Sequence, residues 1–368
     1  MALREPDATG DSWENEMARV NGSLIRACLE TLYFSGAHHI ARPFLAGVGA
    51  VLTFHRVRPA SNDAFQPNQL LEITPDYLDQ ILRRIRGDGV EIVSLDEAAR
   101  RLREGDVSSR FVALTFDDGY RDNRDYALPI LRKYDAPFTI FIPSDFAEGK
   151  GELWWVALER AVAGSDRIEI VYGGERRVFA CADVAAKTAT MRKIYWWLRG
   201  LPHDEDIRRV VRDIADAAGL RVEPICSELC MDWDELRAFG KDELVTIGAH
   251  TVTHPILSKV PADRVEREMR DGAAEIERVL GVRPVHFSYP VGDSPSAGPR
   301  EFAIAETLGF RSAVTTRPGV LFAEHGGHMT ALPRMSMNGS FQRLRYFDVL
   351  LSGAPTALFN RFRRIDAT

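Results

Sequence analysis

The sequence predicts an α/β fold built on a parallel sheet, and three observations indicate that class. Short apolar segments typical of strands alternate with amphipathic segments typical of helices, which is the rhythm of βαβ units. Two of the strand-like segments end abruptly in carboxylates or imidazoles. Parallel α/β folds place their sites at the carboxyl ends of the strands. The chain of 368 residues is long enough for one large domain or two smaller ones.

The alternation can be followed along the chain by the positions of its apolar residues. Strands are expected at 51–57, 90–94, 111–116, 137–143, 245–249, 285–289, 312–316 and 332–337. Helices are expected between them at 77–87, 95–104, 121–134, 261–280 and 300–308. The rhythm stops after Pro143 and resumes at Val245. An insertion that does not belong to the repeating unit is therefore expected at about 150–232.

The insertion itself has readable elements. A helix begins at Trp154, a β-hairpin turns at Gly173-Gly174, and helices follow at 185–199 and 204–218. Asp232 is expected to cap a further helix in a capping box with Glu235. Five of the six tryptophans lie in or beside this region: Trp154, Trp155, Trp196, Trp197 and Trp233. Such rings stack on sugars, but a small satellite core is the favoured interpretation, because tryptophan is usually well buried.

The strongest chemical signal is the pair of acids Asp117-Asp118, followed by Gly119. The apolar run 111–116 leads straight into them, so both acids should leave the sheet at its carboxyl rim. The plain alternative is a strand that ends in an Asx turn, because acidic residues are common in turns.

The end of a second strand carries two imidazoles, and this favours a functional site over a simple Asx turn. The run 245–249 is followed by His250 and His254. Imidazole and carboxylate together suit zinc or another divalent first-row metal. Asp118, His250 and His254 would provide three protein ligands and leave an open position for water and substrate, as a hydrolytic metal requires. Asp117 is then free to act as a base.

At these residues the chain resembles the polysaccharide deacetylases of the NodB-homology type, carbohydrate esterase family four. The resemblance rests on the segments 115–119 and 250–255, with support from 287–292, and covers roughly Val48 to Met337. It implies a distorted (β/α)7 TIM-like barrel that removes N-acetyl, and sometimes O-acetyl, groups from amino-sugar polymers or oligomers. A lipid-linked glycan is a further candidate substrate. The resemblance also implies that Asp117 is the base and that Asp118, His250 and His254 hold the metal, most often zinc, with cobalt or nickel as alternatives.

The resemblance assigns two further residues near the substrate or the oxyanion. Tyr120 follows the glycine and is expected to offer its backbone N–H to the oxyanion. Tyr289, at the end of the strand 285–289, is also expected to contact the substrate or the oxyanion. The family often carries an arginine near the position of Ser288 that orients the base, and this chain lacks it there. The partner of Asp117 is therefore left open.

The general acid is also left open by the motifs, because the family's leucine-histidine pair near the last strand is absent. His55 is the preferred candidate, since it ends the first strand and a rigid element would present it at the same rim as Asp117. His325 and His328, in a glycine-rich segment before the last strand, are the competing candidates.

Composition limits the partners. The net charge of −6 gives no support for nucleic-acid binding, which usually leaves a basic footprint. The four cysteines show no framework spacing, so reduced thiols are expected. The first twenty residues are polar and show no basic region followed by an apolar core. We therefore expect a cytoplasmic protein, with association to the inner face of the membrane as an open alternative.

Three regions are expected: an N-terminal tail and amphipathic helix at 1–47, the deacetylase barrel at 48–340, and a basic amphipathic tail at 341–368. Each terminal region could pack on the barrel or contact a membrane surface. Packing is favoured for the N-terminal helix.

Two other classes of function stay open. Adjacent acids at a strand end also hold magnesium in phosphoryl-transfer enzymes. The missing motifs are compatible with a degenerate sugar-binding module. The sequence names neither the glycan nor the oligomeric state.

Overall fold

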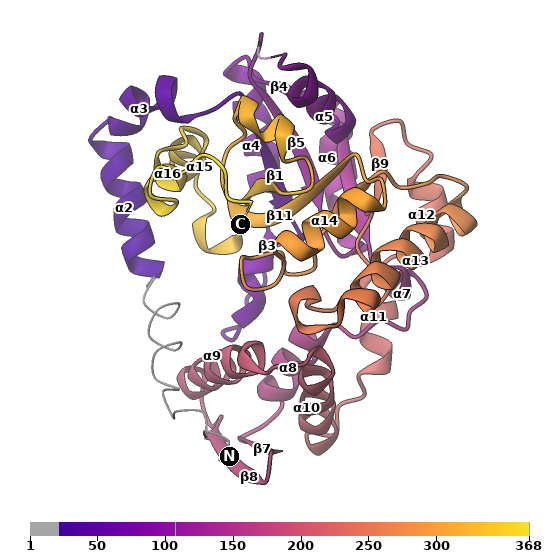
Figure 1. The fold of residues 1–368 in the computed structure, drawn as a ribbon. Helices are drawn as coiled ribbons and strands as arrows, with labels where there is room; N and C mark the ends of the chain where they lie inside the picture. The colour runs from indigo at the N-terminus through magenta and orange to yellow at the C-terminus, as the bar shows by residue number, and fades with distance from the viewer. Residues whose placement is uncertain (1–21, 107, 368) are drawn as a thin grey trace, which may run out of the picture.

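The structure, a computed structural model, describes residues 22–106 and 108–367, and its centre is a closed barrel of parallel strands (Figure 1). Around the barrel the strand order is β1-β12-β11-β10-β9-β6-β5, and β5 pairs back onto β1. These seven strands are β1 (Gly49–Phe54), β5 (Phe111–Phe116), β6 (Phe138–Ile142), β9 (Val245–Ala249), β10 (His286–Ser288), β11 (Ser312–Pro318) and β12 (Leu332–Ser336). The predicted TIM-like barrel is confirmed.

An eighth strand, β4 (Glu91–Val93), pairs with residues 111–113 of β5. On the same edge of β5, residues 114–116 pair with β6. The expected strand 51–57 is broken at His55. Its second part, β2 (Arg56–Val57), pairs instead with β3 (Glu72–Ile73) in a separate sheet. Arg56 donates a 2.7 Å hydrogen bond to Asp122 there, which draws this short segment away from the barrel.

Helices cover the outside of the barrel, so its strands are buried on both faces. This explains the uninterrupted apolar runs of β1 and β5, in which every residue is buried. At the junction of these strands Gly49 leaves no room for a side chain, since a Cβ there would lie 2.7 Å from the Phe111 carbonyl oxygen. The covering helices are α4 (Pro75–Gly87), α5 (Leu95–Glu104), α6 (Leu128–Lys133), α13 (Ala262–Leu280) and α14 (Pro299–Thr307).

The insertion forms a lobe at one end of the barrel (Figure 1). Its elements are α8 (Trp154–Ala163), β7 (Arg167–Tyr172), β8 (Glu175–Ala180), α9 (Val184–Gly200) and α10 (Asp204–Ala217). They enclose a second hydrophobic core that contains Trp154 and Trp155, as the favoured interpretation expected. The chain leaves the barrel for the lobe through α7 (Ser144–Ala147). It returns to the barrel through α11 (Glu223–Leu229) and α12 (Trp233–Phe239). The capping box of Asp232 and Glu235 is present.

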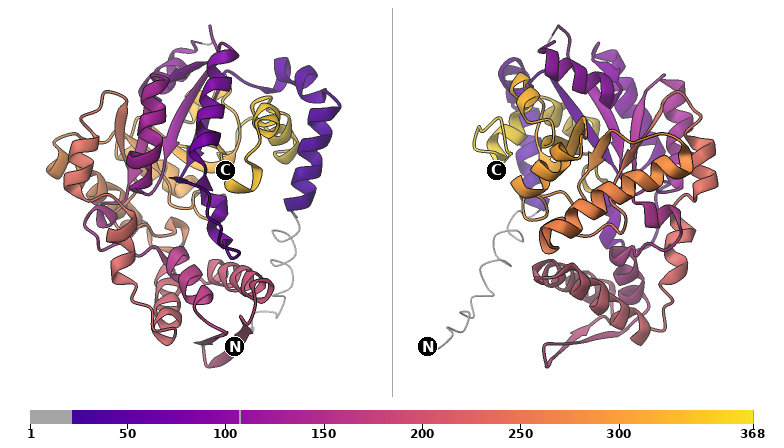
Figure 2. Two further views of the ribbon diagram at one scale, coloured as in Figure 1. Left: turned by 180° about the vertical axis from the view of Figure 1, so that it is seen from behind. Right: turned by 45° about the vertical axis from the view of Figure 1, so that its right-hand side comes forward.

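The described parts of both terminal regions, 22–47 and 341–367, pack beside the barrel and contain four helices (Figure 2). They are α2 (Gly22–Phe34), α3 (Ala37–Leu45), α15 (Leu344–Leu351) and α16 (Ala354–Phe359). Leu29 of α2 is buried against Tyr346 and Val349 of α15, so packing holds for these helices. The polar segment 1–21 lies outside the described residues. Within 22–106 and 108–367, no helix is both long and apolar enough to span a bilayer. All four cysteines are free thiols.

Candidate active site

Three side chains converge where β5 and β9 end. One ligand atom each from Asp118, His250 and His254 lies within 4.8 Å of the others, and all three residues are buried. The Nε2 atoms of His250 and His254 are 3.5 Å and 3.3 Å from Asp118 Oδ1. The structure thus brings together the three residues that the sequence predicted as metal ligands.

The backbone around the acids is held in an unusual conformation. Asp118 has φ 71° and Gly119 has φ 67°, so two successive residues are left-handed. Aspartate tolerates this region better than most residues, and glycine is favoured next because its φ of 67° is strained for a residue with a side chain. Such local strain is concentrated at functional sites. The Asp-Asp-Gly sequence is therefore what turns both carboxylates into the mouth of the barrel.

The loop that carries the second histidine is braced from two sides. Glu268 of α13 accepts hydrogen bonds from the backbone N–H groups of Val252 and Thr253, at 3.0 Å and 2.9 Å. Arg208 of α10 donates to the carbonyl oxygens of Thr253 and His254 at 2.8 Å and 2.9 Å. His254 itself has φ 58°. The insertion lobe thus fixes the position of a predicted metal ligand.

The donor set fits a divalent metal. Asp118 Oδ1 is buried and has no hydrogen-bond partner among the described residues, although two imidazole nitrogens face it. His250 Nδ1 lies 2.6 Å from the Ser288 carbonyl oxygen, which makes Nδ1 the donor and leaves the Nε2 lone pair directed at the site. Burial would raise the pKa of Asp118, but the two imidazoles hold that pKa well below its usual range. A buried carboxylate oxygen that faces two imidazole nitrogens and has no hydrogen-bond partner in the described chain is a metal-ligand arrangement.

The partner of Asp117, which the motifs left open, is Arg334 of β12. Arg334 Nη1 and Nη2 donate to the two carboxylate oxygens of Asp117 at 2.8 Å and 2.6 Å. Arg334 Nη2 also donates to Ser288 Oγ at 3.0 Å, so the small Ser288 leaves room for a guanidinium that arrives from another strand. Burial would raise the pKa of Asp117, but Arg334 holds it below the ordinary value.

Arg334 was missed by the sequence interpretation, which expected only a strand at 332–337. A signal was present: the strand carries one arginine between two apolar neighbours, Pro333 and Met335. A charged residue in a buried strand requires a partner. The strand pattern could not say which acid that partner was.

His55 directly follows β1 and lines the same cavity as Asp117 and Asp118. Its ring forms no hydrogen bond within 22–106 or 108–367, so it is available to a ligand. Burial lowers the pKa of His55, and the nearby charges of Asp118 and Asp117 oppose that effect. The lower pKa makes the protonated ring a stronger acid and reduces the fraction protonated at neutral pH.

The two competing histidines lie at the other end of the barrel. His325 belongs to the short 3-10 helix Ala323–Gly327, where its Nδ1 accepts from the Phe322 backbone N–H at 3.0 Å. The next residue, Gly326, packs against the Leu102 carbonyl at the end of α5. Leu321, just before this helix, pairs with Gly49 at the start of β1. Neither His325 nor His328 lines the cavity that holds Asp118.

The two tyrosine side chains do not join the site. The Tyr289 hydroxyl donates to the Thr330 carbonyl oxygen at 2.8 Å, and its ring packs on Phe287 and Phe302 in the main core. The Tyr120 hydroxyl accepts from Trp155 Nε1 at 3.1 Å in the core of the insertion lobe. Burial raises the pKa of both phenols. The prediction for Tyr120 concerned its backbone N–H and stays a prediction.

A cavity of about 530 Å³ opens above the acids and histidines. One wall comes from the barrel rim and carries His55 and Asp117. The opposite wall comes from the insertion lobe, mainly α8 and α9, and is aromatic. Its aromatic side chains are Trp154, Trp155, Tyr195 and Trp196. The tryptophans therefore serve both purposes that the sequence left open: they build a core, and some of their faces line the cavity.

Comparison with known proteins agrees with this geometry. The family model described as polysaccharide deacetylase matches residues 104–313. No curated protein matches the chain.

Solved structures with the same fold include two deacetylases and the protein IcaB. The Streptococcus pyogenes deacetylase PplD in complex with acetate is 19% identical, with a TM-score of 0.54, and the match covers 82% of this chain and 96% of that one. IcaB from Ammonifex degensii is 19% identical, with a TM-score of 0.51 and coverage of 83% and 96%. A de-N-acetylase from Aggregatibacter actinomycetemcomitans is 14% identical, with a TM-score of 0.52 and coverage of 82% and 99%.

Proposed function

The chain belongs to the polysaccharide deacetylase family, and from that premise we propose that it is a metal-dependent enzyme that hydrolyses N-acetyl groups of an amino-sugar oligomer, polysaccharide or lipid-linked glycan. It is a hydrolase of carbon–nitrogen bonds other than peptide bonds. The observation that carries the metal dependence is the buried group of Asp118, His250 and His254, with an unpartnered oxygen of Asp118 at its centre.

Asp118, His250 and His254 would hold a divalent metal, with zinc the best match to two imidazoles and one carboxylate, and cobalt or nickel as alternatives. Such a metal supplies Lewis-acid chemistry, because it polarises an acyl carbonyl and makes a water molecule more acidic. Three ligands from the chain leave the side toward the cavity for substrate. The bracing of the histidine loop by Glu268 and Arg208 keeps the ligand geometry fixed before substrate arrives.

Asp117 is the proposed base. Its Oδ1 accepts one hydrogen bond from Arg334 and keeps a further lone pair for a water proton, whereas its Oδ2 accepts from both Arg334 and Ser288 Oγ. The low pKa of Asp117 keeps the carboxylate ionised at neutral pH. Arg334 therefore positions the base and prevents its protonation, at the expense of some basicity.

His55 is the proposed acid, which gives a proton to the departing amine nitrogen. It faces the cavity from β1, next to the strand that carries Asp117. The backbone carbonyl of His55 accepts from Asn123 Nδ2 at 2.9 Å, so the residue is anchored while its ring stays free. Expulsion of an amine requires protonation of its nitrogen, and a positioned imidazole typically contributes about 10²- to 10⁴-fold.

The aromatic wall supports a sugar as the substrate. Trp154 and Trp155 are largely buried and therefore rigid, and Tyr195 and Trp196 are half-buried at the cavity. Sugar rings present apolar C–H faces that stack on such side chains. Asn68 and Asp293 add polar side chains to the same cavity, where they are held by hydrogen bonds with Glu159 and Arg199.

The deciding experiment is an acetate-release screen with the purified full chain. Acetylated amino-sugar oligomers, nucleotide sugars and lipid-linked amino sugars would be compared after chelation and reloading with zinc, cobalt, nickel or magnesium. We expect acetate from at least one class, restored by a first-row transition metal and not by magnesium. His203→Ala, an exposed histidine at the start of α10, is the matched control for the ligand variants.

The same screen separates the rival functions. Phosphate release supported by magnesium alone would favour phosphoryl transfer. Sugar binding without acetate release in every metal would favour a degenerate binding module. Arg334 argues against the second outcome, because the orienting arginine that the module hypothesis counted as missing is supplied from β12.

A further inference from the structure

The terminal helices expose large apolar side chains in one place. Among the described residues, six such side chains come from the end of α2, from α3, and from α16 with the turn after it, and they are between 51% and 76% exposed. We call these six residues the terminal patch: Phe34, Ile40, Phe44, Leu358, Phe359 and Phe362. Every exposed phenylalanine among the large exposed apolar residues of 22–106 and 108–367 belongs to it.

The parts of the terminal patch adjoin one another. Ile40 and Phe44 are four residues apart on α3 and share one face of that helix. Gly353, which precedes α16, lies so close to the end of α3 that a Cβ on it would come 1.9 Å from the Leu45 carbonyl oxygen. The α2–α3 pair and the α15–α16 pair lie side by side at one edge of the barrel in both views (Figures 1 and 2).

The two terminal segments that carry the terminal patch have a positive net charge, although the whole chain carries −6. Two of their arginines, Arg42 and Arg364, pair with Asp88 and Glu324 of other segments. Residues 22–47 and 341–367 contain seven arginines and three acids. Each acid is already engaged: Glu30 with Arg345 at 2.6 Å, Asp348 with Arg84 at 2.8 Å, and Asp366 with Arg317 at 2.9 Å.

Two exposed arginines have no such acid. Arg361 and Arg363 flank Phe362, and neither forms an ion pair in the described part of the chain. The turn that presents them is fixed, because the Phe362 backbone N–H donates to the Ala357 carbonyl oxygen at 2.6 Å. An apolar side chain between two free guanidinium groups requires an occupant that is both apolar and anionic.

The exposed apolar side chains and the free arginines together indicate which kind of partner the terminal patch binds. A symmetric contact between two copies of this chain would bring two sets of Arg361 and Arg363 into one interface, where like charges repel and the acids of the same segments are already engaged. The surface of an anionic bilayer offers phosphate groups and acyl chains at adjacent depths. We propose that the terminal patch binds an anionic membrane surface, with its phenylalanines at the acyl boundary and Arg361 and Arg363 at the headgroup phosphates.

The experiment is co-sedimentation of the full chain with phosphatidylcholine vesicles that contain or lack phosphatidylglycerol. We expect binding to the mixed vesicles, and at least ~10-fold weaker binding for Phe359→Ser/Phe362→Ser, because interfacial binding scales with buried apolar area. Val171→Ser/Val178→Ser removes two exposed apolar side chains from the insertion hairpin and is the matched control.

The charge requirement is tested in the same assay. Arg361→Gln/Arg363→Gln should weaken binding by about 10-fold or more and reduce its sensitivity to salt. Arg167→Gln/Lys193→Gln, which removes two exposed cations of the insertion, should bind as the unmodified chain does. All these side chains are exposed, so the variants should keep the melting temperature of the parent.

Three outcomes would overturn the proposal: no binding to mixed vesicles at low salt, equal binding to pure phosphatidylcholine, or a dimer in solution that Phe359→Ser/Phe362→Ser dissociates. The last would assign the terminal patch to self-association. Acetate release from a soluble sugar is measured separately, so failure here leaves the proposed enzymatic function untouched.

Discussion

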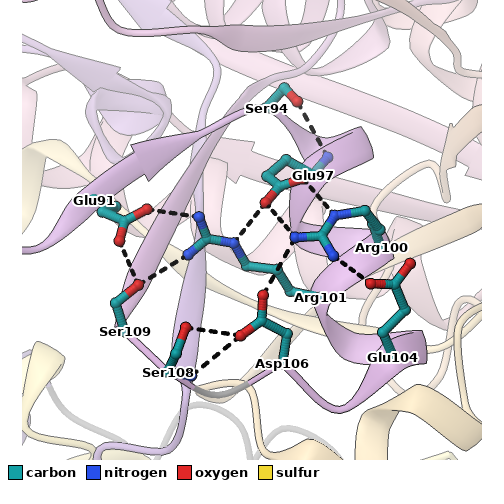
Figure 3. Close-up of polar contacts among 9 residues, drawn as sticks. All are labelled: Glu91, Ser94, Glu97, Arg100, Arg101, Glu104, Asp106, Ser108 and Ser109. Atoms are coloured by element: carbon teal, nitrogen blue, oxygen red, sulfur yellow. Dashed lines mark hydrogen bonds and ion pairs between the residues drawn. The ribbon is translucent and has the colours of Figure 1, made fainter.

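The carboxyl end of the barrel and the surface around α5 both concentrate charge, but they arrange it in opposite ways. At the site, Arg334 and Asp117 are almost fully buried, and Asp118 keeps an unpartnered buried oxygen. Around α5, at the amino end of the strands, Arg100 and Arg101 share Glu97 and reach further acids on all sides (Figure 3).

The difference shows what each arrangement is suited to. In the α5 network almost every group has a second partner, such as Glu91 and Ser109 for Arg101, and most of its side chains are partly exposed. Losing one contact there leaves the others and admits water. At the site, the buried Asp117 carboxylate has one cationic partner, Arg334, and water cannot replace that cation. A redundant exposed network stabilises weakly, whereas a buried non-redundant one determines function.

The largest effect is expected from the three predicted metal ligands. His250→Ala, His254→Ala and Asp118→Ala should each lose bound metal and activity together, because each removes one of only three ligands from the chain. Metal content by mass spectrometry and acetate release are the measurements. Wild-type metal stoichiometry in all three variants would contradict the assignment of these residues as metal ligands. The control His203→Ala should resemble the parent in both assays.

Arg334→Met should cost about 3–5 kcal/mol in the free energy of unfolding, since it leaves the buried Asp117 carboxylate without its cation. Urea unfolding at neutral pH is the measurement. The double variant Asp117→Asn/Arg334→Met removes both charges and should recover part of that loss. If the single and double variants were equally unstable, the charge pairing would not be the cause.

Asp117→Asn should retain metal and lose at least ~100-fold in kcat, the scale of general-base catalysis. It should be assayed well below its melting temperature, because Arg334 then lacks its carboxylate partner. Asp234→Asn, at an exposed acid, is the control. Near-normal turnover would place the base elsewhere.

His55→Ala should bind metal normally while kcat falls by ~100-fold or more, because the ring forms no hydrogen bond within the described chain and lines the cavity. His328→Ala, at an exposed histidine at the far end of the barrel, is the comparison. A normal kcat for His55→Ala together with a reduced one for His328→Ala would reverse the assignment.

The sequence predicted those parts of the site that depend on contiguous residues. Asp117-Asp118-Gly119 and His250-x3-His254 are each delivered by one strand, so local patterns were sufficient. Arg334 contacts Asp117 across 217 residues of sequence, and only strand order and register bring the two together. The same limit applies to Glu268 and Arg208, which brace the histidine loop from helices outside the motifs.

Tyr289 illustrates a signal that was present but unused. Successive side chains of a strand point to opposite faces. Ser288 points into the barrel toward Asp117, with its hydroxyl 3.3 Å from Oδ2. Its neighbours Phe287 and Tyr289 must therefore face the helices, where both are buried in the main core. The alternation alone would have removed the Tyr289 side chain from the expected site.

The smallest effect is expected at Glu97, where the α5 network is densest. Its hydrogen bonds with Arg100, and then with Arg101, lower the pKa of Glu97 to about 2. A carboxyl whose folded pKa is depressed stabilises the fold above its unfolded pKa, which is roughly 4.3, and loses that contribution as the pH falls toward the folded value. Because Glu97 is partly exposed, solvent screening should reduce the contribution to about 1 kcal/mol or less.

Glu97→Gln should therefore cost about 0.5–1 kcal/mol at neutral pH, measured by urea unfolding. The difference from the parent should shrink in high salt and as the pH falls below about 4, because the parent's carboxylate then becomes protonated too. Acetate release should not change, since α5 ends at the opposite side of the barrel from Asp117. A loss near that of Arg334→Met would show that the exposed network is not redundant, and the contrast between the two regions would fail.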